Sequence, residues 1–249
     1  MVQVNEILQN AALKSAHETV YSRWMRMHHS RERRIMDRRL VVSLCLLLIS
    51  GIALSLAAYI FGVFPFDLKV AFALRGEDNP VFAAVMTAVS FLGDGWVPVI
   101  LVFAVAAICA IRKKWVEAVF VVATLTSGIL AGVLKMLVGR QRPPSFSLNP
   151  DDIFPSFNQY AYPSGHVLFF VVFFGFTAYL AGRYLTGWMK GITISVCAGL
   201  IVLIGPSRIY LGEHWVSDVI GSYIIGTFWL IILILLYQMV IRKRRGSDP

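Results

Sequence analysis

Long segments without Asp, Glu, Lys or Arg constrain the fold of this chain more than any other feature. A helix that crosses the hydrocarbon core of a membrane needs about 20 mostly apolar residues, and its backbone groups must be bonded within the segment. Six segments meet or approach this length: 40–66, 95–111, 118–134, 167–182, 191–207 and 219–241. We therefore expect an all-α fold, a polytopic membrane helical bundle with six transmembrane helices.

The composition agrees with this class and excludes others. Of the 249 residues, 57% are hydrophobic and only 15% are charged. A water-soluble globule or a disordered chain would carry more charge and less apolar surface. A transmembrane β-barrel is excluded because the apolar segments lack the required alternation.

Shorter segments divide the chain further. Segment 81–92 is apolar but too short to span a membrane, so we expect a short interfacial or re-entrant helix there. The basic N-terminal arm, 1–39, has the apolar spacing of a short amphipathic helix on the membrane surface, and a regulatory or partner-binding arm is the alternative. The membrane domain is expected over 40–241, followed by a basic tail, 242–249. No cleavable signal peptide is expected.

The basic residues predict the orientation of the chain. Its net charge is +9, and Lys and Arg cluster within 23–39 and 242–245, on either side of the apolar segments. Because such residues favour the cytoplasmic side, we expect a multi-pass protein of the cell (inner) membrane with both termini in the cytoplasm. Loops 67–94, 139–165 and 208–217 would then be extracytoplasmic. Anionic lipid headgroups account for the basic clusters, so no nucleic-acid partner is expected.

The cysteines do not predict a metal site. Cys45, Cys109 and Cys197 each lie inside an apolar segment, without a second Cys or a His at metal-binding spacing. We expect them to be packing residues, and we expect neither a bound metal nor an organic cofactor.

The first polar cluster of the expected outer face follows the third apolar segment. Arg140 and Arg142 follow Lys135, with Arg142 seven residues after it, and Pro143 and Pro144 come next. If the helix continued, this spacing would be about two turns and would bring Lys135 and Arg142 to one side. Cations on this face favour an anionic ligand, although snorkelling to lipid phosphate explains these two residues equally well.

The second cluster, Ser164, Gly165 and His166, stands directly before the fourth apolar segment. The free N–H groups at the start of a helix bind anions, and an imidazole there can donate a proton. Taken alone, Ser164 is more typical of a helix N-cap.

The third cluster holds Arg208, His214 and Asp218 between the last two apolar segments. On a helix, Asp218 would lie beside His214, accept a ring N–H and leave the other nitrogen free to attack. A purely structural His–Asp pair is the alternative. Glu213 is expected to point elsewhere, since adjacent residues on a helix do not share a face. Asp94, between two glycines, is interpreted as a helix cap and left out of the site.

All three clusters are expected at the same face, although they come from separate parts of the chain. Together they would supply cations, two imidazoles, a hydroxyl and a carboxylate. Such a set suits a multiply charged oxyanion that undergoes covalent transfer.

The same residues carry a resemblance to a known family. Lys135 with Arg142-Pro143 fits KxxxxxxRP, residues 163–166 fit PSGH, and residues 207–218 fit SRxxxxxHxxxD. In motif order, spacing and placement between apolar segments, the chain resembles the membrane lipid phosphate phosphatases of the type-2 phosphatidic acid phosphatase (PAP2) superfamily over about residues 40–241.

The resemblance implies a metal-independent phosphatase with a phosphohistidine intermediate. His214 would be the nucleophile, Asp218 would orient it, and His166 would protonate the leaving oxygen and later activate water. The residues implied to hold the phosphoryl oxygens are Lys135, Arg142, Ser164, Gly165 and Arg208. The substrate would be a membrane-embedded lipid phosphate such as undecaprenyl or another polyprenyl diphosphate, phosphatidate or phosphatidylglycerol phosphate.

Other functions stay open at this point. A lipid phosphotransferase of the same family would keep the same motifs. A lipid or anion transporter is an alternative of a different class, and a non-catalytic interaction protein is another. The charged residues gather at one expected face instead of along a path through the bilayer, which favours the enzyme.

Overall fold

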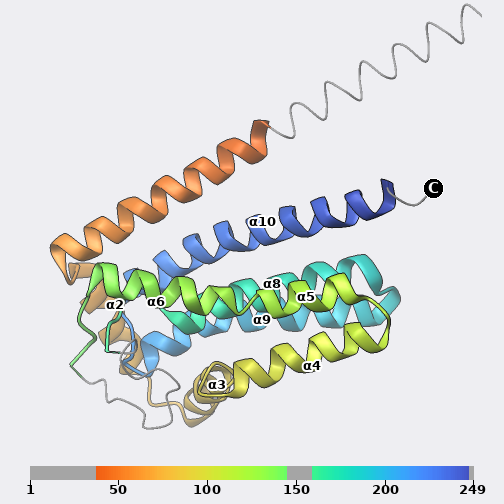
Figure 1. Cartoon of the computed structure of the whole chain (residues 1–249). Helices are drawn as coiled ribbons and strands as arrows, with labels where there is room; N and C mark the ends of the chain where they lie inside the picture. Colours follow the sequence, from red (N-terminus) through yellow and green to blue (C-terminus); the bar gives the residue numbers. More distant parts are fainter. Residues whose placement is uncertain (1–37, 145–158, 247–249) are drawn as a thin grey trace, which may run out of the picture. The chain divides into compact units, whose positions relative to one another are not determined.

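A computed structural model of the chain describes residues 38–144 and 159–246 (Figure 1). The expected amphipathic helix near the N-terminus lies outside these described residues. The chain divides into two compact units, Met1–Leu46 and Leu47–Pro249. Within the first unit, the described residues 38–46 are the beginning of the apolar helix Arg38–Phe61. The rest of this helix and all elements below belong to the second unit.

The described part of the second unit is helical apart from its loops and one isolated β-bridge, between Gln141 and Tyr160. Its helices after Phe61 are α2 (Pro65–Arg75), α3 (Pro80–Phe91), α4 (Val97–Ile111), α5 (Trp115–Ala123), α6 (Thr126–Val138), α8 (Gly165–Tyr184), α9 (Gly187–Tyr210) and α10 (Val216–Gly246). The all-α fold is therefore confirmed.

Within the described residues, five helical segments are long and apolar enough to cross a membrane. They are Arg38–Phe61, Trp115–Val138, Gly165–Tyr184, Gly187–Tyr210 and Val216–Arg244. The second of them consists of α5 and α6. The sixth expected span, 95–111, is the shorter helix α4, with 15 residues. At 1.5 Å per residue it reaches about 22 Å, less than the roughly 30 Å of a bilayer core.

Local sequence explains where the helices differ from expectation. Gly62 has a positive φ of 66°, and Pro65 begins α2, so the first apolar helix ends at Phe61 instead of residue 66. The short helix expected over 81–92 is present as α3. Helix α10 continues to Gly246, beyond the expected boundary at 241.

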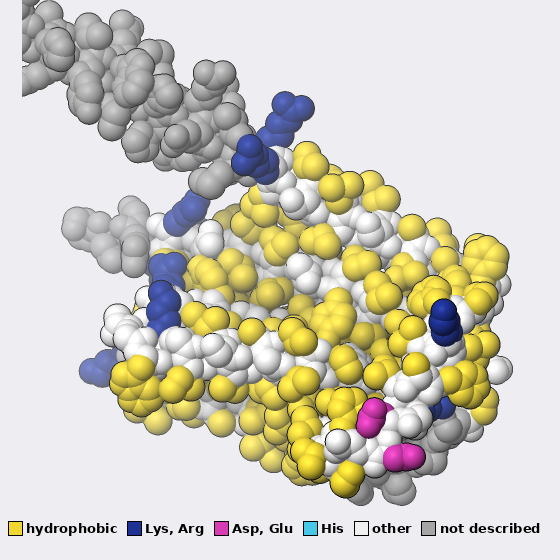
Figure 2. Space-filling model, turned by 180° about the vertical axis from the view of Figure 1, so that it is seen from behind, with side chains coloured by type: hydrophobic (Ala, Val, Ile, Leu, Met, Phe, Trp, Pro, Cys, Tyr) yellow, Lys and Arg dark blue, Asp and Glu magenta, His cyan; other side chains and the backbone are white. Residues whose placement is uncertain are grey.

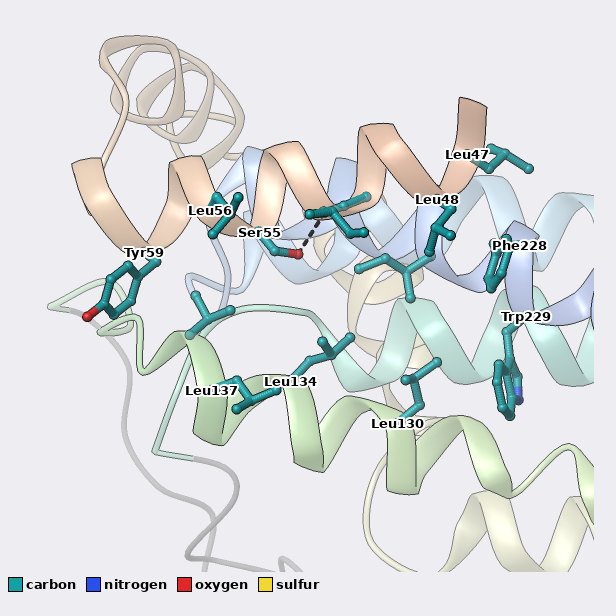
Figure 3. A pocket seen from close by; sticks show the side chains of 14 residues that line it. Leu47, Leu48, Ser55, Leu56, Tyr59, Leu130, Leu134, Leu137, Phe228 and Trp229 are labelled. Carbon is teal, nitrogen blue, oxygen red and sulfur yellow. Dashed lines mark hydrogen bonds between the residues drawn. The ribbon is translucent and has the colours of Figure 1, made fainter. Parts of the chain in front are cut away.

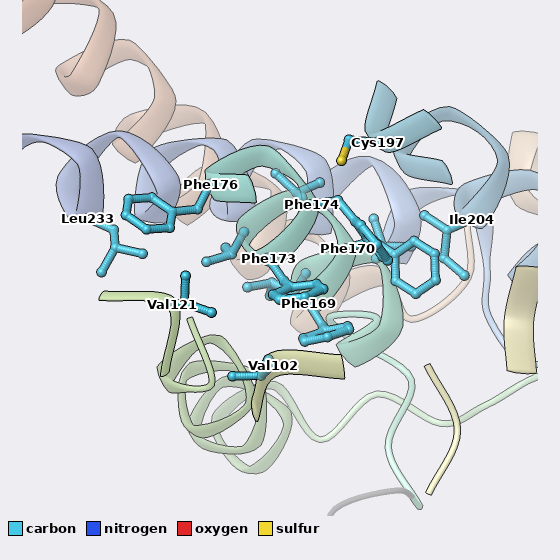
Figure 4. Close-up of a cluster of buried hydrophobic side chains, with 14 of the residues drawn as sticks. Val102, Val121, Phe169, Phe170, Phe173, Phe174, Phe176, Cys197, Ile204 and Leu233 are labelled. Atoms are coloured by element: carbon cyan, nitrogen blue, oxygen red, sulfur yellow. The ribbon is translucent and has the colours of Figure 1, made fainter. Parts of the chain in front are cut away.

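Helix α8 is the most buried of the long apolar segments. Its five phenylalanines, between Phe169 and Phe176, pack among residues of α4, α5, α9 and α10 (Figure 4). The rings of Phe169 and Phe173 stack with centroids 5.1 Å apart. Because lipid is as apolar as these rings, they stabilise the bundle through close packing more than through removal from water.

Large hydrophobic side chains also cover much of the outside of the bundle. Ile100, Phe103, Val119, Ile129 and Val202 are each more than half exposed, and hydrophobic atoms dominate the face in Figure 2. A soluble protein rarely exposes so large an apolar surface. Lipid is the solvent that suits it.

Candidate active site

The ends of four helices meet where the sequence motifs lie. Helices α8 and α9 pack together and are joined only by Leu185 and Thr186, so they run antiparallel, and a short turn likewise reverses the chain between α9 and α10. The start of α8, the end of α9 and the start of α10 therefore lie at one end. The end of α6 joins them because Ala161 N–H donates to the Arg140 carbonyl at 2.7 Å.

Gly139 separates the two cations of the first motif. It ends α6 in the left-handed conformation, with φ 61°, and its N–H bonds to the Lys135 carbonyl. Lys135 is buried on the last turn of α6, whereas Arg142 lies beyond the helix. The expected two-turn helical step between them was therefore wrong, and the glycine rather than the two prolines ends the helix.

The second motif begins α8. Ser164 is fully buried, its N–H donates to Ser222 Oγ at 2.7 Å, and its hydroxyl makes no capping bond to α8. Among the described residues this hydroxyl has no hydrogen-bond partner. Ser164 therefore takes the expected N-cap position of α8 but without the side-chain capping bond, and its buried hydroxyl is left for a ligand.

Asp94 belongs to this cluster, contrary to the sequence interpretation. Its Oδ1 lies 2.7 Å from His166 Nε2 and 3.8 Å from Arg208 Nη1. The N-cap position of α4 is Trp96, without a side-chain cap bond. Gly93 allows the approach, because a Cβ there would lie 2.1 Å from His166 Cδ2. In the sequence, the glycines on either side of Asp94 were the one indication that another side chain packs closely against this turn.

His214 and Asp218 approach each other, but not as neighbours on one helix. His214 lies in the turn before α10, and Asp218 lies in its first turn. His214 Nδ1 is 3.7 Å from Asp218 Oδ2, longer than a hydrogen bond. The same oxygen accepts the Trp215 N–H at 2.8 Å. The structure brings the two side chains near each other, but without the expected helical stacking or ring hydrogen bond.

Arg140, outside the predicted site, holds Asp218 and is itself held by Asp67. Arg140 donates through Nη1 to Asp218 Oδ1 and through Nη2 to Asp67 Oδ2, the latter at 2.6 Å. Ser217 bonds to both Asp67 and Arg140 through its hydroxyl. Each of these side chains is almost fully buried. Opposite charges in two expected outer loops were the signal that could have identified Asp67 and Arg140.

Arg208 contacts two other parts of the site. It donates to Ser90 of α3 and forms an ion pair with Glu213. Glu213 Oε2 also lies 3.6 Å from Arg142 Nη1. The expectation that Glu213 points elsewhere was wrong, because residues 211–214 form a turn and the helical rule does not apply.

The surroundings set the charge of His214. Burial, followed by the positive charges of Arg142, Arg208 and Lys135, lowers the pKa of the His214 imidazole well below its usual value. The ring is therefore neutral near pH 7 and can act as a nucleophile. Burial alone would raise the pKa of Asp94, but its hydrogen bond to His166 and the nearby charges of His166 and Arg208 lower it.

The described residues contain no group of three His, Cys, Asp or Glu side chains placed to hold a metal ion. The donors that converge here are guanidinium groups, an ammonium group and hydroxyls. Such donors bind anionic oxygen.

An apolar cavity of about 450 Å³ opens beside the motifs. It lies between the helix Arg38–Phe61, α6 and α10, and leucines of α6 face Leu48 and Leu56 across it (Figure 3). Ser55 on its wall donates to the Tyr162 hydroxyl at 3.1 Å, and Tyr162 directly precedes the second motif. A hydrogen bond therefore links the wall of the cavity to the residue that precedes the second motif.

Comparisons with known proteins agree with this arrangement. A sequence profile described as the PAP2 superfamily matches residues 117–242. The chain is 31% identical over 162 residues to a phosphatidylglycerophosphatase B of Bacillus subtilis, covering 64% of this chain and 75% of the relative. It is 30% identical to an undecaprenyl-diphosphatase of Sulfolobus acidocaldarius, covering 55% of this chain and 61% of the relative.

A solved structure shows the same fold. The crystal structure of a transmembrane PAP2-type phosphatidylglycerolphosphate phosphatase from Bacillus subtilis is similar with a TM-score of 0.68 and 24% sequence identity. The similarity covers 80% of this chain and 97% of the other.

Proposed function

Because the chain belongs to the PAP2 superfamily, as a multi-pass membrane member of its lipid phosphatases, we propose that it hydrolyses the phosphomonoester or pyrophosphate of a membrane lipid. The observation that carries the proposal is the buried imidazole of His214, placed beside the carboxylate of Asp218 and among cations that lower its pKa. Polyprenyl diphosphate, phosphatidate and phosphatidylglycerol phosphate are the candidate substrates.

The reaction begins at His214. Its Nδ1 faces Asp218, so Nε2 is the atom that attacks phosphorus. The new P–N bond forms as the P–O bond to the lipid breaks, and His166 donates a proton to the departing oxygen. Water then attacks the phosphohistidine, loses a proton to His166 and releases inorganic phosphate. Hydrolysis leaves both imidazoles in their starting state.

Five residues are assigned to hold the phosphoryl oxygens, through positive charge or through N–H and O–H donors. These are Lys135, Arg142, Ser164, Gly165 and Arg208. Ser164 supports this role through its buried, unbonded hydroxyl. A donor of this kind contributes about 3–4 kcal/mol to the transition state in comparable sites.

Asp67, Arg140 and Asp94 have supporting roles. Arg140 balances the buried charge of Asp218 and fixes its direction, and Asp67 does the same for Arg140. Asp94 stabilises the protonated form of His166 when that ring holds a proton.

We place the site at the extracytoplasmic face, with both termini in the cytoplasm. This orientation counts α4 as a sixth, short crossing and rests on the distribution of Lys and Arg. The apolar cavity beside the site supports a substrate whose tail stays in the membrane.

The test is phosphate release by the purified chain in detergent, measured on a panel of polyprenyl, diacyl and glycerophosphate lipids. We expect turnover of at least one lipid, unaffected by EDTA, and a loss of about a thousandfold or more in His214→Ala. Phosphate found on a second lipid would instead identify a phosphotransferase. If no lipid is hydrolysed but labelled lipid crosses liposomes that contain the chain, the transporter is correct.

A further inference from the structure

Glu213 lies where two arginines of the phosphoryl site meet. Its Oε2 pairs with Arg208 Nη2 and lies 3.6 Å from Arg142 Nη1. The arginine side chains are 6% and 2% exposed for Arg142 and Arg208, whereas that of Glu213 is 26% exposed. A carboxylate thus neutralises two nearly buried guanidinium groups from the more open side.

A carboxylate and a phosphoryl group present the same chemistry to guanidinium. Both offer pairs of oxygen atoms that match its planar fork of donors. They cannot occupy the same donors together, because like charges a few ångströms apart repel strongly where little water enters. A phosphoryl group that reaches Arg142 and Arg208 must therefore displace the Glu213 side chain.

The backbone around Glu213 permits this displacement. Residues 211–214 form a turn, and the Glu213 N–H donates to the Arg208 carbonyl at 3.1 Å. Its own carbonyl accepts from Arg142 Nη1 at 3.0 Å. These backbone bonds can persist while the side chain rotates outward. Asp94, the other carboxylate near Arg208, is held by His166 instead.

We propose that Glu213 is an internal competitor that occupies the phosphoryl subsite between Arg142 and Arg208 until a phosphate ligand displaces it. The inference rests on the proposed function, which assigns these arginines to the phosphoryl group. Competition from Glu213 weakens binding of free inorganic phosphate, the product. A lipid phosphate overcomes it because contacts to its tail add to its affinity. Released phosphate, which lacks these contacts, therefore leaves the site more readily than it would without Glu213.

The test is binding of inorganic phosphate to the full-length chain in detergent, measured by calorimetry without turnover. Glu213→Gln removes the charge at nearly constant size, and Glu213→Ala removes the side chain beyond Cβ. Glu77→Gln is the matched control, because this substitution removes the same charge from an exposed loop between α2 and α3. Thermal melting checks that each variant is folded.

We expect both Glu213 variants to bind inorganic phosphate about tenfold more tightly than the unaltered chain, and Glu77→Gln to bind as the unaltered chain does. Unchanged or weaker binding in the folded Glu213 variants overturns the proposal, since Glu213 would then only hold the arginines in place. If the Glu213 variants bind phosphate as expected but the chain releases no phosphate from any lipid, the proposed hydrolase activity is wrong. The competition between Glu213 and phosphate is then still supported.

Discussion

At the residue scale, Arg140 fixes the carboxylate beside the proposed nucleophile. It pairs with Asp218 through one nitrogen and with Asp67 through the other. Arg140→Lys keeps the charge but loses the two-pronged donor. We expect kcat to fall about a hundredfold, because Asp218 and His214 shift from their working geometry. KM should change little, since the phosphoryl ligands are untouched.

Initial rates over a range of lipid phosphate concentrations separate these two effects. Arg112→Lys, at the exposed end of α4, is the control and should behave as the unaltered chain. Arg140→Ala leaves two buried carboxylates without their cation and should lower the free energy of unfolding by about 3–5 kcal/mol. Unchanged kcat in folded Arg140→Lys contradicts the positioning role.

The same residues show what the sequence could and could not predict. His214, His166 and Arg208 follow from motif spacing, because their chemistry is written in short segments. Asp67 and Arg140 do not, because 73 residues separate them and neither is a fixed position of a motif. Their pairing depends on tertiary packing. A buried acid needs a cationic partner, but the sequence alone does not say which one.

At the element scale, the turn between α3 and α4 brings Asp94 to His166, and Gly93 is the residue that permits it. A Cβ at this position would lie 2.1 Å from His166 Cδ2. Gly93→Ala should therefore displace the ring and lower kcat about 10- to 100-fold. Gly182→Ala, on α8 with nothing within 4 Å of the added atom, is the control.

Steady-state rates with a saturating lipid phosphate measure this effect. Equal kcat in both glycine variants would show that the turn does not position His166. The path of this turn could not be predicted from the sequence. Hydrophobicity predicted which segments are helices, but not how the loops between them run. Apolar length predicted the helices α8, α9 and α10. It did not predict that Gly139 would end α6 or that α4 would be short.

At the scale of the whole molecule, the site forms because helix ends meet although their motifs lie far apart in the chain. Lys135 and Asp218 are separated by most of the region that the PAP2 profile matches. The antiparallel order of α8, α9 and α10 brings the second and third motifs together. The sequence indicated this convergence through the placement of charges, and the helical packing of the second unit supplies it.

The most direct test of this account is to trap the covalent intermediate. Lipid labelled in its phosphoryl group is mixed with the chain and quenched with alkali within one turnover, because phosphohistidine is labile to acid. Mass spectrometry then locates the label. We predict label on His214, none in His214→Ala, and accumulation in His166→Ala, where water is no longer activated. Label on another residue, or phosphate release with no labelled protein at any time, would contradict the account.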